Sequence, residues 1–422
     1  MIDANLSLPN RAWILLSLLS CLAPEANARA DDALNDDKSA KSPLGSIVTV
    51  SERALELHRG SLVFDGHNDL PWQFRKQPDR SKPFDISMSQ PQLHTDIPRL
   101  RAGGVGAVFW SAYTPSDGPK DRPASRLVHE QIDVIQQMIA RYPETFEAAT
   151  SAADVERIRK AGKIASLIGL EGGHAIDNSL AVLRELHGRG ARYMTLTHAD
   201  TNDLADAGTD KPRHRGLSDL GREVVGEMNR LGMIVDISHV SADTMRDVLK
   251  VSSAPVIASH SSVFAICPHV RNVPDDVLAL IKANRGVVMV NFFSGFVVPR
   301  NAELAETMFR VRRELNAKSS NQAEADRAFD QWKRENPMQK GTILDVVDHI
   351  DHIVKIAGID HVGLGSDFDG VTMLPQDLED VSTFPRITQI LLDRKYSEQD
   401  IQKILGENTL RVLREVGERA AR

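Results

Sequence analysis

The sequence predicts an α/β fold in which eight parallel strands alternate with helices and close into a (β/α)8 barrel of the TIM type. Short apolar runs alternate along the chain with amphipathic segments of helical periodicity, as in a series of βα units. Nearly every apolar run also ends in a histidine or an acidic residue, and barrel enzymes build their sites at the carboxyl ends of the strands. An open, doubly wound sheet is the alternative, but its site would draw on few strands at one switch point.

Eight apolar runs are the candidate strands. They span residues 61–65, 105–110, 165–170, 193–197, 233–238, 255–259, 286–291 and 362–366. Helices are expected at residues 126–141, 220–231, 243–251, 275–283 and 343–357, where apolar residues share one face. Ser241 and Pro274 fit the starts of two of these helices, because serine caps amino-termini and proline is tolerated there. Residues 49–422 are therefore predicted to form one barrel domain.

The first part of the chain has the pattern of an export leader. Arg11 precedes an apolar stretch at residues 12–19, which is too short to span a membrane, and residues 26–30 fit a small-residue cleavage pattern. Residues 1–30 are thus predicted to be a signal peptide, and residues 31–48 a flexible polar tether. We expect an exported protein, periplasmic or extracellular, without a membrane-spanning segment in the mature chain. Lipoprotein anchoring through Cys21 is the alternative.

Residues 301–340 interrupt the alternation between the seventh and eighth strands. The segment is charged and helix-prone, so a helical insertion on the active-site side of the barrel is expected. Two interpretations are open for it: a lid over the site, or a solvated helical hairpin without a role.

The overall composition is that of an ordinary globular protein. Of the 422 residues, 41% are hydrophobic and 26% are charged, as in chains with a large core. The formal net charge of -7 gives no reason to expect a nucleic-acid partner.

Five residues at the ends of apolar runs predict a binuclear metal site at the C-terminal face of the barrel. His67 and Asp69 are two residues apart, and on extended backbone such side chains point to the same face. Glu171 ends a buried run, where a carboxylate is costly unless it is paired or metal-bound. His239 and His260 end two successive runs, and neutral imidazole is a preferred zinc ligand. His67 and Asp69 could hold one zinc ion, and the two other histidines a second, with Glu171 between them.

The same residues belong to motifs that occur in one order along the chain. The motifs are FDGHNDLPW at 64–72, GLEGGH at 169–174, LTH at 196–198, SHVS at 238–241, SHSS at 259–262, RNVPDD at 271–276, NF at 291–292 and GSDFDG at 365–370. They resemble the membrane (renal) dipeptidase family of zinc metallopeptidases over nearly the whole chain from about residue 50 to 417. The chain is identified as an exported member of the bacterial type.

The resemblance implies a binuclear zinc barrel that hydrolyses dipeptides, including some with a D-residue on the C-terminal side. It implies two Zn2+ ions per subunit, bridged by Glu171, with His67 and Asp69 on one ion and His239 and His260 on the other. A hydroxide that bridges the two ions would attack the peptide bond.

Three further residues receive roles from the resemblance. His198 would contact the substrate and stabilise the oxyanion, Arg271 would pair with the free carboxylate of the substrate, and Asp367 would carry the proton as acid and base. The alternatives are a structural strand-end histidine for His198, a surface ion pair for Arg271, and a carboxylate that orients a metal-bound imidazole for Asp367.

Other functions remain open at this point. A binuclear amidohydrolase acting on lactams, lactones or N-acyl amino acids would use the same ligands. A non-catalytic exported zinc-binding protein is a further alternative. The family analogy also suggests a homodimer.

Overall fold

In the part of the chain that the structure describes, nine parallel strands pair in the order β2-β1-β9-β8-β7-β6-β5-β4-β3, and β2 also pairs with β4. This last pairing closes eight strands into a barrel and leaves β3 outside it. The strands are β1 (Val63–Asn68), β2 (Val105–Tyr113), β3 (Phe146–Ala148), β4 (Ile164–Glu171), β5 (Ala191–Thr195), β6 (Ile234–Asp236), β7 (Ile257–Ala258), β8 (Val287–Val290) and β9 (Val362–Leu364). The computed structural model describes residues 47–77, 84–116, 122–319 and 321–420. The predicted (β/α)8 barrel is confirmed.

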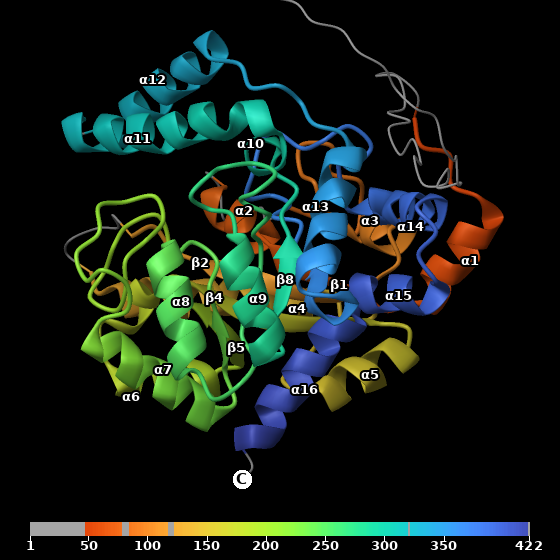
Figure 1. Cartoon of the computed structure of the whole chain (residues 1–422), viewed down its shortest axis with the longest axis horizontal. Helices are drawn as coiled ribbons and strands as arrows, with labels where there is room; N and C mark the ends of the chain where they lie inside the picture. The colour runs from red at the N-terminus through yellow and green to blue at the C-terminus, as the bar shows by residue number, and fades with distance from the viewer. Residues whose placement is uncertain (1–46, 78–83, 117–121, 320, 421–422) are drawn as a thin grey trace, which may run out of the picture. The chain divides into compact units, whose positions relative to one another are not determined.

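Helices surround the strands (Figure 1). They are α1 (Glu52–Gly60), α2 (Leu70–Lys76), α3 (Ile97–Ala102), α4 (Ala124–Arg141), α5 (Ala152–Lys160), α6 (Leu180–Gly188), α7 (Asp219–Leu231), α8 (Ala242–Val251), α9 (Asp275–Asn284), α10 (Ser294–Val297), α11 (Ala302–Lys318), α12 (Gln322–Glu335), α13 (Ile343–Ile356), α14 (Phe384–Asp393), α15 (Glu398–Gln402) and α16 (Asn408–Ala420). The five helices expected from periodicity correspond to α4, α7, α8, α9 and α13. Helices α11 and α12 lie side by side at the end of the barrel toward which the strand β8 points (Figure 1).

The first strand does not lie where the sequence pattern placed it. The run 61–65 was expected to end before His67, but β1 begins at Val63 and continues through His67 to Asn68. Asp69 has φ -97° and ψ 15° and begins α2, so it is not on extended backbone. The two side chains converge because the chain turns after β1. The short strand β3 was not predicted, since three residues show no periodicity.

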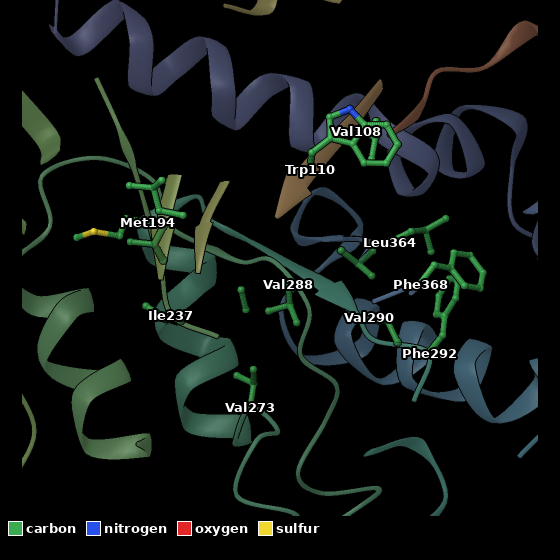
Figure 2. Packing of buried hydrophobic residues seen from close by; sticks show 14 of the residues in the cluster. Val108, Trp110, Met194, Ile237, Val273, Val288, Val290, Phe292, Leu364 and Phe368 are labelled. Atoms are coloured by element: carbon green, nitrogen blue, oxygen red, sulfur yellow. The ribbon is translucent and has the colours of Figure 1, made fainter. Parts of the chain in front are cut away.

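Two layers of apolar side chains hold the barrel together. Alternate residues of the strands, such as Phe64, Phe109 and Tyr193, belong to one buried cluster, and their neighbours along the strands belong to a second, larger one. Figure 2 shows part of the second cluster, in which Val288 and Val290 of β8 lie near other buried residues between the sheet and the helices. The strands are thus buried on both faces, which explains their continuous apolar sequences.

The predicted leader and most of the predicted tether lie outside the described residues. The description begins at Ile47, and the backbone amide of Val48 donates to Asp377 Oδ1 at 3.2 Å. Within the described residues, no helix combines the length and the apolar character that crossing a membrane requires.

Two glycines allow close approach of strands beneath the carboxyl end of the barrel. A Cβ atom added to Gly66 would lie 2.0 Å from Sδ of Met289 and 2.8 Å from the carbonyl oxygen of Ser259. A Cβ atom on Gly365 would lie 1.9 Å from that same oxygen. The oxygen of Ser259 belongs to the backbone directly after β7, so it cannot move away cheaply.

Replacing Gly365 by alanine should therefore destabilise the protein by at least about 2 kcal/mol, because overpacking against backbone has no soft neighbour to displace. Urea-induced unfolding measures this change. Gly226→Ala is the matched control: it lies in α7 with nothing within 4 Å of the new Cβ atom, and it should raise the free energy of unfolding by about 0.5–1 kcal/mol. Equal effects of the two substitutions would contradict the close approach.

Candidate active site

The carboxylate of Glu171 lies at the centre of the candidate site, at the carboxyl end of β4. Its side chain is only 6% exposed, and its two oxygens face different groups of side chains. Oε2 accepts a hydrogen bond from Ser111 Oγ at 2.9 Å and lies 3.5 Å from His67 Nε2. Oε1 lies 3.1 Å from His239 Nε2 and 3.6 Å from His260 Nε2. The structure thus brings these four predicted residues together.

His67, Asp69 and Asp367 form the group on the Oε2 side. Nε2 of His67 lies 3.2 Å from Oδ2 of Asp69, and one ligand atom from each of the three residues lies within 4.8 Å of the others. Asp367 follows β9, where its backbone amide donates to the carbonyl oxygen of His67 at 3.1 Å. Its φ of 62° is unusual for a residue with a side chain, and such strained backbone is common at functional sites.

His239, His260 and His198 form the group on the Oε1 side. The Nε2 atoms of His239 and His260 lie only 2.8 Å apart. His198 Nε2 is 3.7 Å from Glu171 Oε1, and its ring lies 4.4 Å from the ring of His239. His198 therefore lies about as close to the central carboxylate as the predicted ligand His260 does.

Hydrogen bonds to the Nδ1 atoms of His67 and His260 fix the orientation of these two imidazoles. Nδ1 of His67 lies 2.7 Å from the hydroxyl oxygen of Tyr193, and Nδ1 of His260 lies 2.8 Å from Oγ of Ser259. Ser259 donates its hydroxyl proton to Oδ2 of the buried Asp236 at 2.5 Å, so the hydroxyl oxygen is left to accept from His260. The ring of His260 then carries its proton on Nδ1, and both rings turn Nε2 toward Glu171. Bonds of this kind commonly orient metal-binding histidines.

The donor atoms fit divalent cations. His67 Nε2 is buried and has no hydrogen-bond partner among the described residues. Nε2 of His239 and Nε2 of His260 lie 2.8 Å apart, and both lie within 3.6 Å of Glu171 Oε1, so the nitrogen atoms that could ligate a cation converge on one carboxylate oxygen. Imidazole nitrogen with carboxylate oxygen is a donor set that zinc accepts.

The pKa of Asp367 is shifted upward, whereas the pKa of Glu171 is held below its usual range by the surrounding histidines despite burial. Burial, reinforced by the negative charge of Asp69, raises the pKa of Asp367 to about 8. Its Oδ2 accepts a hydrogen bond from Asn291 Nδ2 at 2.7 Å, so the carboxyl group is held in one orientation. Asp369, two residues later, instead accepts the backbone amide of His94 at 2.8 Å and lines the same cavity.

Arg271 is fully buried and lines the cavity, and it is not the surface residue of the alternative interpretation. The only hydrogen bonds of its guanidinium among the described residues are long, at 3.4 Å to Ser261 Oγ and 3.5 Å to the carbonyl oxygen of His260. Burial lowers its pKa to about 10, so the guanidinium stays charged at neutral pH. The fork of donors therefore retains capacity for an anionic partner.

A cavity of about 330 Å³ opens above these residues. Its wall includes side chains from α2, β2, the segment at α10, and both helices of the 301–340 segment. These are Trp72, Tyr113, Phe293, Phe296, Met308, Phe309, Phe329 and Lys333. The helices at 301–340 thus contribute directly to the wall of the cavity.

Sequence reasoning missed several residues of the site. Tyr193, Ser259 and Asp236 were assigned only to strands, although a serine directly before a strand-end histidine was a usable signal. Phe309 of α11 and Phe329 of α12 gave no signal, because an aromatic residue on an amphipathic helix is more often part of a core.

One arginine ties the helical pair α11–α12 to the loop after β5. Arg313 of α11 donates to Asp210 Oδ1 at 2.6 Å and to the carbonyl oxygen of Thr209, and it lies 3.8 Å from Asp200. Arg313→Ala should therefore loosen this segment locally, while the barrel remains intact. We expect faster cleavage within residues 301–335 by a glutamate-specific protease, at an unchanged midpoint of thermal unfolding. Arg310→Ala, whose partner Glu314 is on the same helix, is the matched control and should leave the cleavage rate unchanged.

Comparison with known proteins places this geometry in one family. The family model described as membrane dipeptidase (peptidase family M19) matches residues 51–422. The "probable dipeptidase PvdM" of Pseudomonas aeruginosa is 27% identical with a TM-score of 0.75, over 87% of this chain and 98% of that protein. The metallo peptidase called dipeptidase AC, of family M19, is 26% identical with a TM-score of 0.68, over 85% and 99% of the two chains.

A further structure shares the fold at lower identity. It is a metallo peptidase from Rhodobacter sphaeroides liganded with a phosphinate mimic of the dipeptide L-Ala-D-Ala, 24% identical with a TM-score of 0.69, over 84% of this chain and 99% of that one. Since the family model covers nearly all of the described barrel, this chain belongs to the membrane dipeptidase family, peptidase family M19, and is a hydrolase of the metal-dependent dipeptidase class.

Proposed function

We propose that this protein is a zinc-dependent dipeptidase that holds two zinc ions on either side of Glu171. His67 and Asp69 would bind one ion with Oε2 of the glutamate, and His239 and His260 the other with Oε1. The observation that carries the proposal is that the two oxygens of one buried carboxylate face different imidazoles, Oε2 facing His67 and Oε1 facing His239, while His260 lies close to both His67 and Glu171. A carboxylate placed in this way can bridge two cations, which an imidazole does not normally do.

Two divalent ions in such a site supply an activated water at neutral pH and polarise the carbonyl group of the substrate. The protein supplies the remaining functions. His198, with its ring beside His239 and its side chain 19% exposed, would donate a hydrogen bond to the developing oxyanion. Asp367, held by Asn291 on the opposite side, is placed to carry a proton to the leaving amine.

Arg271 would bind the free carboxylate of the substrate. Its guanidinium is buried beside the metal-binding histidines and makes only long hydrogen bonds to the protein. A bidentate pair with a carboxylate would satisfy it and would restrict substrates to those with a free C-terminus near the scissile bond. This requirement favours dipeptides over those lactams and lactones that carry no carboxylate beside the bond that is cleaved. N-acyl amino acids keep it and remain the second candidate substrate class.

The first test is hydrolysis of L,L- and L,D-dipeptides, L-Ala-D-Ala among them, with and without chelator and added zinc. We expect turnover that chelation abolishes and zinc restores, with two equivalents of metal bound per chain. Glu171→Gln removes the negative charge between the two proposed ions. It should lower the metal content, and it should lower kcat by about 1,000-fold or more. Glu185→Gln, exposed on α6, is the matched control and should change neither.

Absence of turnover on every dipeptide after zinc loading would exclude the peptidase function. Preferential hydrolysis of N-acyl amino acids would favour the alternative amidohydrolase. Stoichiometric zinc binding without any hydrolysis would instead support a zinc-binding protein.

Arg271→Ala should raise KM for dipeptides, because the carboxylate contact is made in the ground state and in the transition state alike. Loss of one partner of a buried ion pair costs about 2 kcal/mol or more, which is about 30-fold in kcat/KM. A dipeptide amide is the control substrate: lacking the carboxylate, it should be hydrolysed equally by wild type and variant. A KM that barely moves would contradict the carboxylate-binding role.

Export, a periplasmic or extracellular location, and a homodimeric state complete the proposed function. The leader pattern at residues 1–30 supports export and the location outside the cytoplasm. Analogy with the family supports the homodimer. The mass of the mature protein recovered outside the cytoplasm would establish the cleavage site, and would distinguish a cleaved leader from a lipid on Cys21.

A further inference from the structure

Three phenylalanines form a continuous aromatic surface on one side of the cavity, here called the aromatic roof: Phe293, Phe296 and Phe309. The rings of Phe293 and Phe296 meet edge to face with centroids 4.9 Å apart, and the ring of Phe296 lies parallel to that of Phe309 at 6.1 Å. Phe293 and Phe296 are 4% and 3% exposed. Phe309 is half-buried and comes from α11.

The packing of the aromatic roof requires a glycine within it. A Cβ atom on Gly295 would lie 2.3 Å from Cε1 of Phe293, so the ring occupies the space that a side chain would need. The backbone after β8 thus holds Phe293 and Phe296 in place, and α11 brings Phe309 onto them. All three residues line the cavity above Glu171.

The aromatic roof adjoins Arg271. The guanidinium carbon of Arg271 lies 5.3 Å from the centre of the Phe296 ring, within the range of a cation–π contact. If Arg271 binds the substrate carboxylate, the α-carbon of the C-terminal residue is only one bond from that group. The side chain of this residue therefore begins next to Phe296 and extends along the surface that Phe309 continues.

We propose that the aromatic roof is the subsite for the side chain of the C-terminal residue, and that it selects bulky apolar side chains there. The inference rests on the proposed dipeptidase function and adds its substrate class. Phe309, supplied by the helical pair α11–α12, is the specificity-determining residue. Burial of apolar side-chain surface against three rings supplies the preference.

A charged side chain fits this surface less well. The cation of the nearby wall, Lys333, pairs with Asp330 at 2.8 Å, and its ammonium lies 5.1 Å from the centre of the Phe329 ring. An acidic substrate side chain would have to displace Asp330 from Lys333 while also burying its charge beside aromatic rings.

The test measures kcat/KM for alanyl dipeptides whose C-terminal residue is glycine, alanine, leucine, phenylalanine or glutamate, and for the reversed series with C-terminal alanine. Wild type should prefer alanyl-phenylalanine over alanyl-alanine by about tenfold or more. Phe309→Ala should reduce this ratio at least threefold, whereas Phe309→Leu, which keeps most of the apolar volume, should retain most of it. Phe264→Ala removes a phenylalanine that is 40% exposed and does not line the cavity, and it should leave the ratio unchanged.

The possible results separate the two levels of the proposal. Dipeptide turnover with a ratio that Phe309→Ala does not change would overturn the subsite and leave the dipeptidase function standing. A loss confined to the reversed series would place Phe309 beside the N-terminal residue and would also overturn it, as would a preference for C-terminal glutamate. No turnover of any dipeptide would overturn the proposed function together with the subsite. Thermal unfolding of each variant confirms that it is folded.

Discussion

Burial of one carboxylate among imidazoles is the constraint on which this structure depends. An ionised glutamate at 5% exposure is costly unless positive charge or donated hydrogen bonds surround it. Glu171 is the last residue of β4, and its backbone is paired with Tyr113 of β2 on one side and with Thr195 of β5 on the other. The closed sheet therefore fixes its position, and the histidines at the ends of neighbouring strands reach it from two directions.

Much of the barrel and of the site could be predicted because the relevant signal is local. A histidine or carboxylate directly after an apolar run reads as a strand-end residue whatever its distant neighbours are, and this was enough for Glu171, His239 and His260. The residues behind them could not be found in this way. Tyr193 contacts His67, which is 126 positions away in the sequence, and no local pattern near either residue predicts this contact.

The remaining differences also follow from tertiary pairing. The sequence placed His67 after the first strand, whereas β1 continues through it, because pairing of Asn68 with Trp110 of β2 extends the strand beyond its apolar stretch. The position of α11 and α12 could be predicted from composition, but their orientation could not. Phe309 and Phe329 look like core residues of any amphipathic helix, and only the folded chain places them on the wall of the cavity.

The helical pair α11–α12 leaves the barrel after β8 and returns before α13 without contributing a strand to the closed sheet. Insertions, deletions and substitutions there leave the strand-end residues around Glu171 in place, and Arg313 is one polar tie that a change must respect. Phe309, the residue proposed to determine specificity, therefore lies in a stretch of the chain separate from the strand-end residues around Glu171. Within this architecture, diversification of substrate range can proceed by exchange of one surface hairpin while the hydrolytic machinery is inherited unaltered.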